Sequence, residues 1–225
     1  RGGLRRVGGG QALIAAVNGA SAEAAAAKLR EGGLKAASCA CDVTDSGAVA
    51  ALFAANTIDV VVNNAGVSAR IPAEDYPDAD LKKILELNVN GVFYMMRQAA
   101  KHWIAGKRAK SIINLASFAG VVADPLSAPY AASKGAVVQL TRTCAVEWAK
   151  HNVRVNAIGP GYVRTEMTAH TLAQPEARAV INAKTAMGRP AVPNEIAGAA
   201  VYLASKASSY VTGAILMVDG GWTAM

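Results

Sequence analysis

The sequence contains few of the residues that build metal sites and disulfide frameworks. Its 225 residues include 3 Cys and 3 His. Cys39 and Cys41 alternate along a predicted strand and Cys144 falls in a predicted helix, so we interpret them as small buried hydrophobic residues. The histidines lack the spacing of metal ligands, since they stand at His102, His151 and His170. We therefore expect neither a bound metal nor a disulfide framework.

A long apolar run is also absent from the sequence. A membrane-spanning helix needs about 18 or more apolar residues, and the uncharged stretch around Ser111–Ala123 is interrupted by Asn114, Ser117 and Gly120. No secretory signal pattern precedes the first predicted strand. These observations predict no membrane span, and they lead us to expect a cytoplasmic protein.

Overall composition and charge are those of an ordinary globular protein. Hydrophobic residues make up 52% of the chain and charged residues 17%, so we expect one folded domain over residues 1–225. The net charge is +7, but the basic residues are scattered, and the densest cluster, 107–110, falls in a predicted loop. We interpret this charge as a solvated surface that also attracts an anionic cofactor, and we expect no nucleic-acid partner.

Predicted strands and helices alternate along the chain. We expect Ser21 to cap the first helix, and the segment Thr165–Met187 to be variable and mobile. The alternation predicts an α/β fold with a doubly wound parallel sheet. The expected strands are Gln11–Val17, Leu34–Cys41, Ile58–Val62, Ser111–Ala116, Val153–Ile158 and Ala214–Val218. The expected helices are Ser21–Glu31, Ser46–Ala55, Asp78–Leu87, Gly91–Ala105, Ala128–Lys150 and Pro193–Ser205.

Polar or turn-forming residues follow the ends of four of these strands. They are Asp42, Asn64, Ser117 and Pro160. Ligands of such sheets bind outside the carboxyl ends of the strands, so we expect these residues to form one site. Each also has a simpler interpretation: Asp42 can cap a turn, the stretch 63–66 can be a turn alone, and Pro160 can merely end a strand.

A tyrosine and a lysine stand four residues apart at Tyr130 and Lys134, in a predicted helix. This spacing places both side chains on one helix face, about 5–6 Å apart at Cβ. We expect the ammonium to lower the pKa of the phenol, which could then move a proton to or from an alcohol or carbonyl oxygen. The spacing alone is weak evidence, because Tyr202 and Lys206 share it. Only Tyr130 has a serine, Ser117, thirteen residues upstream at the end of a strand.

Several motifs that include these residues occur together and in a fixed order. They are Asp42-Val43, Asn63-Asn64-Ala65-Gly66, Asn88-Val89-Asn90-Gly91, Ser117, Tyr130 to Lys134, Pro160 to Thr165, and Val218-Asp219-Gly220-Gly221. From about residue 11 to its end, the chain resembles the short-chain dehydrogenase/reductase family. The resemblance implies a Rossmann-like, NAD(P)-binding domain.

The resemblance also implies roles for individual residues. Tyr130 would be the acid/base, Ser117 would hydrogen-bond the substrate oxygen, Lys134 would lower the tyrosine pKa and bind the nicotinamide ribose, and Asn88 would hold a water in a proton relay. The cofactor would contact Asp42, Val43, Asn64, Ala65, Gly66, Tyr130, Lys134, Pro160, Gly161, Val163 and Thr165. The substrate would be lined partly by Arg70, Phe118, Asp124, Tyr162 and the segment Thr165–Met187.

One family feature has no counterpart in this sequence. Members carry a first strand and a Thr-Gly-x-x-x-Gly-x-Gly turn whose amides hold the pyrophosphate. The glycine-rich segment Arg1–Gly10 follows no strand and does not match that turn. We expect a first strand and turn upstream, and without them two unpaired strand edges and weak cofactor binding. The missing strand would lie between Gln11–Val17 and Ile58–Val62.

The cofactor type is predicted from the end of the strand Gln11–Val17. NAD-preferring relatives have an acidic residue there, but this chain has Ala15-Ala16-Val17-Asn18. Asn18 or Ser21 could donate to a 2′-phosphate, so we expect NAD or NADP, with a slight preference for NADP.

The resemblance implies an oxidoreductase that moves hydride between NAD(P)(H) and a secondary alcohol or ketone carbon. Substrates of the family include sugars, polyols, steroids and 3-ketoacyl groups. It also implies a homo-oligomer, a tetramer or dimer, associating through the long helix that ends at Lys150 and the C-terminal strand. The alternative is an impaired interaction module that lacks the phosphate-binding loop.

Overall fold

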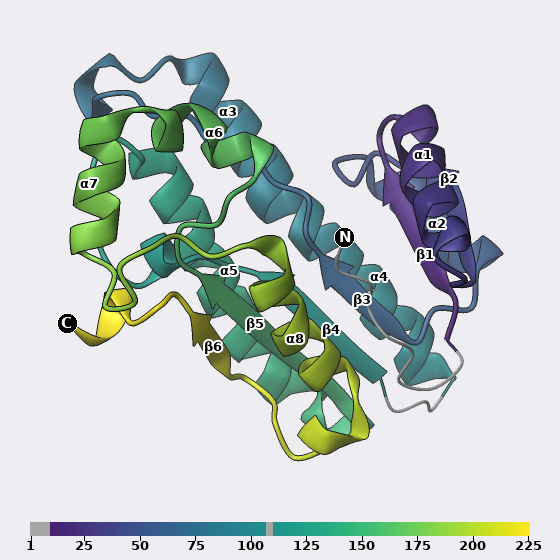
Figure 1. Ribbon diagram of the computed structural model, residues 1–225. Helices are drawn as coiled ribbons and strands as arrows, with labels where there is room; N and C mark the ends of the chain where they lie inside the picture. Colours follow the sequence, from purple (N-terminus) through teal and green to yellow (C-terminus); the bar gives the residue numbers. More distant parts are fainter. Residues whose placement is uncertain (1–9, 107–109) are drawn as a thin grey trace.

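The alternation of strands and helices expected from the sequence is present in the computed structural model, which describes residues 10–106 and 110–225 (Figure 1). The strands are β1 (Ala12–Ala16), β2 (Ala36–Ala40), β3 (Val60–Asn63), β4 (Lys110–Leu115), β5 (Val153–Pro160) and β6 (Ile215–Val218). The α-helices are α1 (Gly19–Glu31), α2 (Ser46–Ala55), α3 (Asp78–Leu85), α4 (Val92–Ala105), α5 (Ala128–Trp148), α6 (Glu166–Ala173), α7 (Pro175–Ala183) and α8 (Pro193–Ala204).

All strand pairs are parallel, as expected, but the strands form two sheets. β3, β4, β5 and β6 pair in that order, while β1 pairs with β2 alone. Among the described residues, no ladder joins β1 to β3, so each of these strands has one free edge. In Figure 1 the purple unit of α1, α2, β1 and β2 stands to one side of the four-stranded sheet. The described part of the glycine-rich segment is Gly10; residues 1–9 lie outside the described residues.

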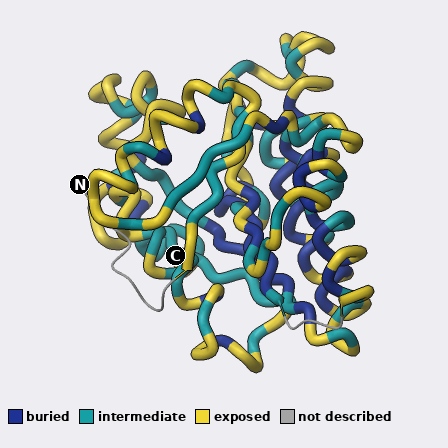
Figure 2. Tube along the Cα trace, turned by 90° about the vertical axis from the view of Figure 1, so that its right-hand side faces the viewer, coloured by how far each residue is buried: buried dark blue, intermediate teal, exposed yellow. Residues whose placement is uncertain are grey.

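Two hydrophobic clusters cover the two faces of the four-stranded sheet. The larger one packs α4 and α5 against the strands through residues such as Met96, Trp103 and Val137. The smaller one packs α8 on the other face through Ile113, Ile158 and Leu203. Buried positions gather in the interior, and exposed positions dominate the outer turns (Figure 2). Each fully buried large side chain contributes about 1.5–3 kcal/mol, so these clusters fix the strand ends that carry the site.

The helix α2 has the predicted bounds, whereas α1 begins two residues earlier than expected. Asp45 caps α2 by accepting hydrogen bonds from Gly47 and Ala48. In α1 the cap is Asn18, whose Oδ1 accepts from the backbone N–H of Ser21 at 3.1 Å. The prediction of Ser21 as the cap was therefore wrong, because an asparagine three residues upstream satisfies the same free donors.

Two other segments differ from the expectation. The segment Thr165–Met187 contains two helices, α6 and α7, instead of irregular chain; Pro175 separates them as the first residue of α7. The predicted helices around 78–105 form one nearly continuous helix, in which Glu86–Gly91 is a π-helical turn. Such turns are rare and frequently occur at functional sites. No helix among the described residues is both long and apolar enough to cross a membrane.

Candidate active site

The structure brings Ser117, Tyr130 and Lys134 together at the carboxyl end of β4. Ser117 precedes a single 3-10 turn, and the backbone N–H of Ala119 donates to its Oγ at 3.2 Å. This turn packs directly on α5: a Cβ at Gly120 would lie 2.8 Å from the carbonyl carbon and oxygen of Lys134. Only glycine therefore allows the loop after β4 to approach the helix this closely.

Lys134 is almost entirely buried, which is unusual for a lysine. Its side chain runs beneath the ring of Tyr130, with Nζ 5.6 Å from the ring centroid, and donates to the Leu115 carbonyl at 2.7 Å. The residue is 5% exposed, and burial lowers the pKa of its amine to about 8. An ammonium has three donors, so donors remain for the hydroxyls of a cofactor ribose. The chemistry of this position fits the predicted nucleotide.

The pKa of Tyr130 differs from the expectation. Burial raises the pKa of its hydroxyl, a hydrogen bond with Ser117 lowers it, and the negative charge of Asp124 raises it. The net direction is upward, so the predicted lowering by Lys134 was wrong for the chain without ligands. The physical reason is that desolvation disfavours the phenolate more strongly than the neighbouring groups favour it. At neutral pH the phenol therefore carries its proton.

Asn88 lies inside the π-helical turn and is fully buried, in contrast to an ordinary helix asparagine. Its Oδ1 accepts from the backbone N–H of Val67 at 2.9 Å, and its Nδ2 donates to the Val67 carbonyl at 2.9 Å and to Ser133 Oγ at 3.0 Å. Both amide hydrogens are thus engaged, so a water held by Asn88 must donate to one of its oxygens. Asn88 fixes the loop after β3 against α5.

The loop after β3 brings small residues close to the same groups. A Cβ at Gly66 would lie 3.2 Å from Asn88 Oδ1 and 3.6 Å from Lys134 Nζ. Asn64 and Ala65 are exposed beside it. Gly91 likewise faces Val43, whose Cγ2 would be 3.0 Å from an added Cβ. Gly66 is partly exposed, so it leaves backbone that a nucleotide can approach, whereas Gly91 is buried and lets the π-helical turn pack against Val43.

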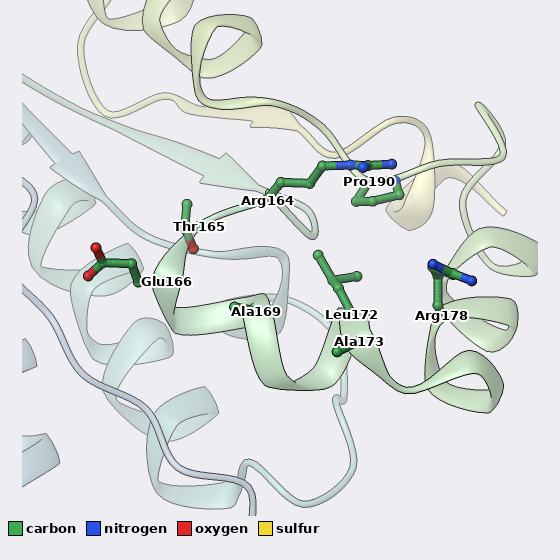
Figure 3. A pocket seen from close by; sticks show the side chains of 8 residues that line it. All are labelled: Arg164, Thr165, Glu166, Ala169, Leu172, Ala173, Arg178 and Pro190. Carbon is green, nitrogen blue, oxygen red and sulfur yellow. The ribbon is translucent and has the colours of Figure 1, made fainter.

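The predicted cofactor segment at the end of β5 is held by a second chain segment. Val163 forms a parallel bridge with Ala191, and a Cβ at Gly161 would lie 2.8 Å from the Cα of Asp219. Thr165 is exposed and is the N-cap residue of α6. A cavity of about 510 Å³ lies between α6, α7 and the chain at Arg164 and Pro190 (Figure 3). Thr165 is the one predicted cofactor contact in its lining. The segment Thr165–Met187, expected to line the substrate, supplies six lining residues, namely Thr165, Glu166, Ala169, Leu172, Ala173 and Arg178, and the other two are Arg164 and Pro190.

The end of β2 supports the simpler interpretation of Asp42 at least in part. Oδ1 of Asp42 accepts from the backbone N–H of Thr44 at 2.9 Å and from its hydroxyl at 2.7 Å, and these bonds lower the pKa of the carboxyl group. Asp42 therefore stabilises a local turn through one oxygen. The other oxygen and the exposed position remain compatible with a ligand.

A polar cluster lies next to Ser117 and Tyr130. Arg70 Nη1 donates to Asp124 Oδ2 at 3.1 Å and to the Tyr162 hydroxyl at 3.0 Å, and Nη2 donates to the Pro125 carbonyl at 2.9 Å. The Tyr162 hydroxyl donates to Asp124 Oδ1 at 3.2 Å, and burial raises its pKa to about 12. The side chain of Arg70 is 34% exposed. The structure thus joins three of the four residues expected to line the substrate.

Sequence reasoning missed two residues of this region. Ser133, on α5, accepts a hydrogen bond from Asn88 Nδ2, and Trp222 contacts both Phe118 and Tyr162. Ser133 lies inside the Tyr130–Lys134 motif, which was a usable signal. Trp222 directly follows the Gly220-Gly221 pair at the end of the last strand, but its contacts are with residues 60 or more positions away.

Comparisons with known proteins agree with this geometry. The family model described as "Enoyl-(Acyl carrier protein) reductase" matches residues 7–223. Gluconate 5-dehydrogenase of Gluconobacter oxydans is 39% identical over 220 residues, which cover 96% of this chain and 86% of that protein. Galactitol 2-dehydrogenase of Cereibacter sphaeroides is 44% identical over 188 residues, or 81% of this chain and 74% of that protein.

A solved structure is similar over nearly the whole chain. A gluconate 5-dehydrogenase from Burkholderia cenocepacia, in complex with NADP and tartrate, aligns with a TM-score of 0.90 and 35% identity, covering 95% of this chain and 85% of that one. Sequence and fold therefore agree, and the chain belongs to the short-chain dehydrogenase/reductase family as an NAD(P)-dependent oxidoreductase that acts on an alcohol or carbonyl carbon.

Proposed function

We propose that the substrate is polyhydroxylated: a sugar, a polyol or a sugar acid. The observation that carries this proposal is the cluster of Arg70, Asp124 and Tyr162 beside Ser117 and Tyr130. It offers donors and acceptors within one small region, which suits adjacent hydroxyl groups better than a steroid or an acyl chain. Relatives named for gluconate and galactitol support the same class.

Backbone contacts around the cluster hold the loops of Arg70 and Asp124 in a fixed arrangement. The backbone N–H of Ile71 donates to the Leu126 carbonyl at 2.9 Å, which ties the loop of Arg70 to the loop of Asp124. Leu126 has a φ of 66°, an unfavourable conformation for leucine that the neighbouring contacts maintain. Arg70 has five N–H donors and uses three in the bonds described above. The other two have no hydrogen-bond partner among the described residues, so they can bind a hydroxyl or carboxylate.

The protonation state of Tyr130 determines the direction in which the site can move a proton. In reduction, Ser117 would hydrogen-bond the carbonyl oxygen. The Tyr130 hydroxyl, which is protonated at pH 7 and whose pKa burial raises further, would donate its proton to the forming alkoxide. The nicotinamide, when bound, supplies or accepts the hydride. Lys134 would bind the ribose, and Asn88 would hold the loop after β3 in place. Oxidation requires the phenolate and is therefore favoured at higher pH.

We propose NADP as the preferred cofactor. The first turn of α1 contains no acidic residue, so nothing there repels a 2′-phosphate. The positive end of the helix favours an anion at this position. Nδ2 of Asn18 is available as a donor because capping uses its oxygen. A solved relative with bound NADP supports this choice.

A cytoplasmic location stays a prediction.

A homodimer or homotetramer is the proposed assembly. An incompletely covered face on α4 and α5 supports this assembly. Val146 is 80% exposed there, and a hollow of about 390 Å³ lies between Arg97, Ile104 and Trp148. We expect V146E to reduce the molar mass measured by light scattering; an unchanged mass would contradict association through this face.

The substrate proposal is tested with a panel of compounds at saturating NADP. We expect turnover of gluconate or galactitol and none of a 3β-hydroxysteroid or a 3-hydroxyacyl thioester. R70Q should raise the KM for the polyhydroxylated substrate about tenfold or more without changing the KM for NADP. Y130F, as the negative control, should lose about 10²–10⁴ in turnover. Turnover of the steroid or acyl substrate alone would overturn the proposal.

A further inference from the structure

Three aromatic rings from distant parts of the chain meet beside the substrate site. Ring centroids lie 4.9 Å apart for Phe118 and Trp222, 5.4 Å for Tyr162 and Trp222, and 5.4 Å for Phe118 and Tyr162. The rings are tilted by 40–50° to one another, a favourable arrangement for aromatic pairs. We call this group the aromatic shelf.

The shelf has a buried layer and an outer layer. Phe118, the neighbour of Ser117 in the chain, is 4% exposed, whereas Tyr162 and Trp222 are half-buried. The indole and the phenol ring therefore lie at the surface above Phe118. The hydroxyl of Tyr162 belongs to the polar cluster with Arg70 and Asp124, so the shelf and that cluster adjoin.

Trp222 is held firmly although it stands three residues before the last residue of the sequence, Met225. The carboxylate of Asp219 accepts from the backbone N–H groups of Gly221 and Thr223, each at 3.0 Å, and from the Thr223 hydroxyl at 2.6 Å. Gly220 and Gly221 have φ values of 65° and 84°, which favour glycine. An added Cβ would collide with Thr185 at 2.7 Å or Ala186 at 2.8 Å, so the turn is fixed against the chain after α7.

This arrangement suits a ligand with one apolar face and a polar rim. A polyhydroxylated carbon chain presents C–H groups on one side and hydroxyls at its edges. We propose that Trp222 is a specificity-determining residue whose ring, with that of Tyr162, contacts the C–H face of the substrate while Arg70 and Asp124 bind its hydroxyls. The inference rests on the proposed function and extends it from the hydroxyl groups of the substrate to its C–H face.

The test compares W222L with the conservative variant W222F and with Y202L, a control that removes a partly exposed aromatic ring from α8. W222L should raise the KM for gluconate or galactitol about tenfold, in line with the energy of an aromatic contact, while the KM for NADP stays within about twofold. W222F should recover most of this loss, and Y202L should match the wild type. Equal increases in the KM for substrate and the KM for NADP in W222L would indicate a general loss of packing in the fold and overturn the inference.

Fluorescence gives a readout that does not depend on turnover. The chain has 3 Trp, and Trp103 is buried with its Nε1 bonded to the Ile58 carbonyl. We expect saturable quenching of the wild-type emission by substrate, and its loss in W222F. Quenching that persists in W222F, or an unchanged KM in W222L, would overturn the role of Trp222 alone. Absence of any binding or turnover of polyhydroxylated compounds would overturn the proposed function as well.

Discussion

At the scale of single residues, the site combines a buried amine with a partly buried phenol, and loss of solvent shifts the pKa values of the two groups in opposite directions. Burial lowers the pKa of Lys134 and raises that of Tyr130. Both effects favour the neutral forms. A neutral phenol is ready to donate a proton, whereas the lysine remains largely charged at pH 7, because its pKa of about 8 lies above that pH.

The burial of Lys134 predicts a specific dependence of stability on pH. The pKa of the amine is about 8 in the folded chain and about 10.4 in an unfolded chain. Between these values the unfolded state binds more protons, so the free energy of unfolding of the wild type should rise with pH. K134M lacks this group and should gain less over the same range. Denaturant melts of both proteins at pH 7, 8, 9 and 10 measure the difference; parallel curves would contradict the assignment.

At the scale of elements, the amino end of α1 is where the cofactor type can be changed. N18D retains an N-cap, since aspartate and asparagine cap helices equally well. It also places a carboxylate where the 2′-phosphate is proposed to bind, and that carboxylate can accept from a ribose 2′-hydroxyl. We expect the ratio of kcat/KM for NADPH over NADH to fall about tenfold or more. Equal thermal melting temperatures for N18D and wild type would show that the helix is intact, and an unchanged ratio would refute the location.

Comparing predicted with observed elements shows which features of the fold local sequence patterns can predict. The β-branched run at Ile58–Val62 and the helical pattern at Ser46–Ala55 are local signals. The helix α2 forms with the predicted bounds, and β3 forms at Val60–Asn63, within one or two residues of the prediction. α6 and α7 were not predicted: α6 is only weakly amphipathic, and Pro175 interrupts the segment between the two helices. Ser117, Tyr130 and Lys134 come together as expected from topology, whereas the contact of Trp222 with Phe118 spans more than 100 residues, which no local pattern encodes. The pKa of Tyr130 depended on burial, which spacing cannot give.

At the scale of the whole molecule, the division of the strands into two sheets separates the nucleotide site into two parts. Asn18 and Asp42 follow β1 and β2, whereas Asn64, Ser117 and Pro160 belong to the four-stranded sheet. The free edges of β1 and β3 leave backbone donors and acceptors of the described strands without ladder partners. A dinucleotide must contact both parts at once, so its affinity depends on how rigidly they are held relative to each other.

This division predicts weak binding of cofactor by the 225-residue chain alone. We expect isothermal titration with NADPH to give a Kd weaker than micromolar, because no strand ladder among the described residues joins the two halves of the site. Gluconate 5-dehydrogenase of Gluconobacter oxydans is a suitable positive control under the same conditions. Micromolar binding by this chain would mean that α2, α4 and the packed core fix the two parts well enough without such a ladder, and the proposed dependence on the sheet would then be wrong.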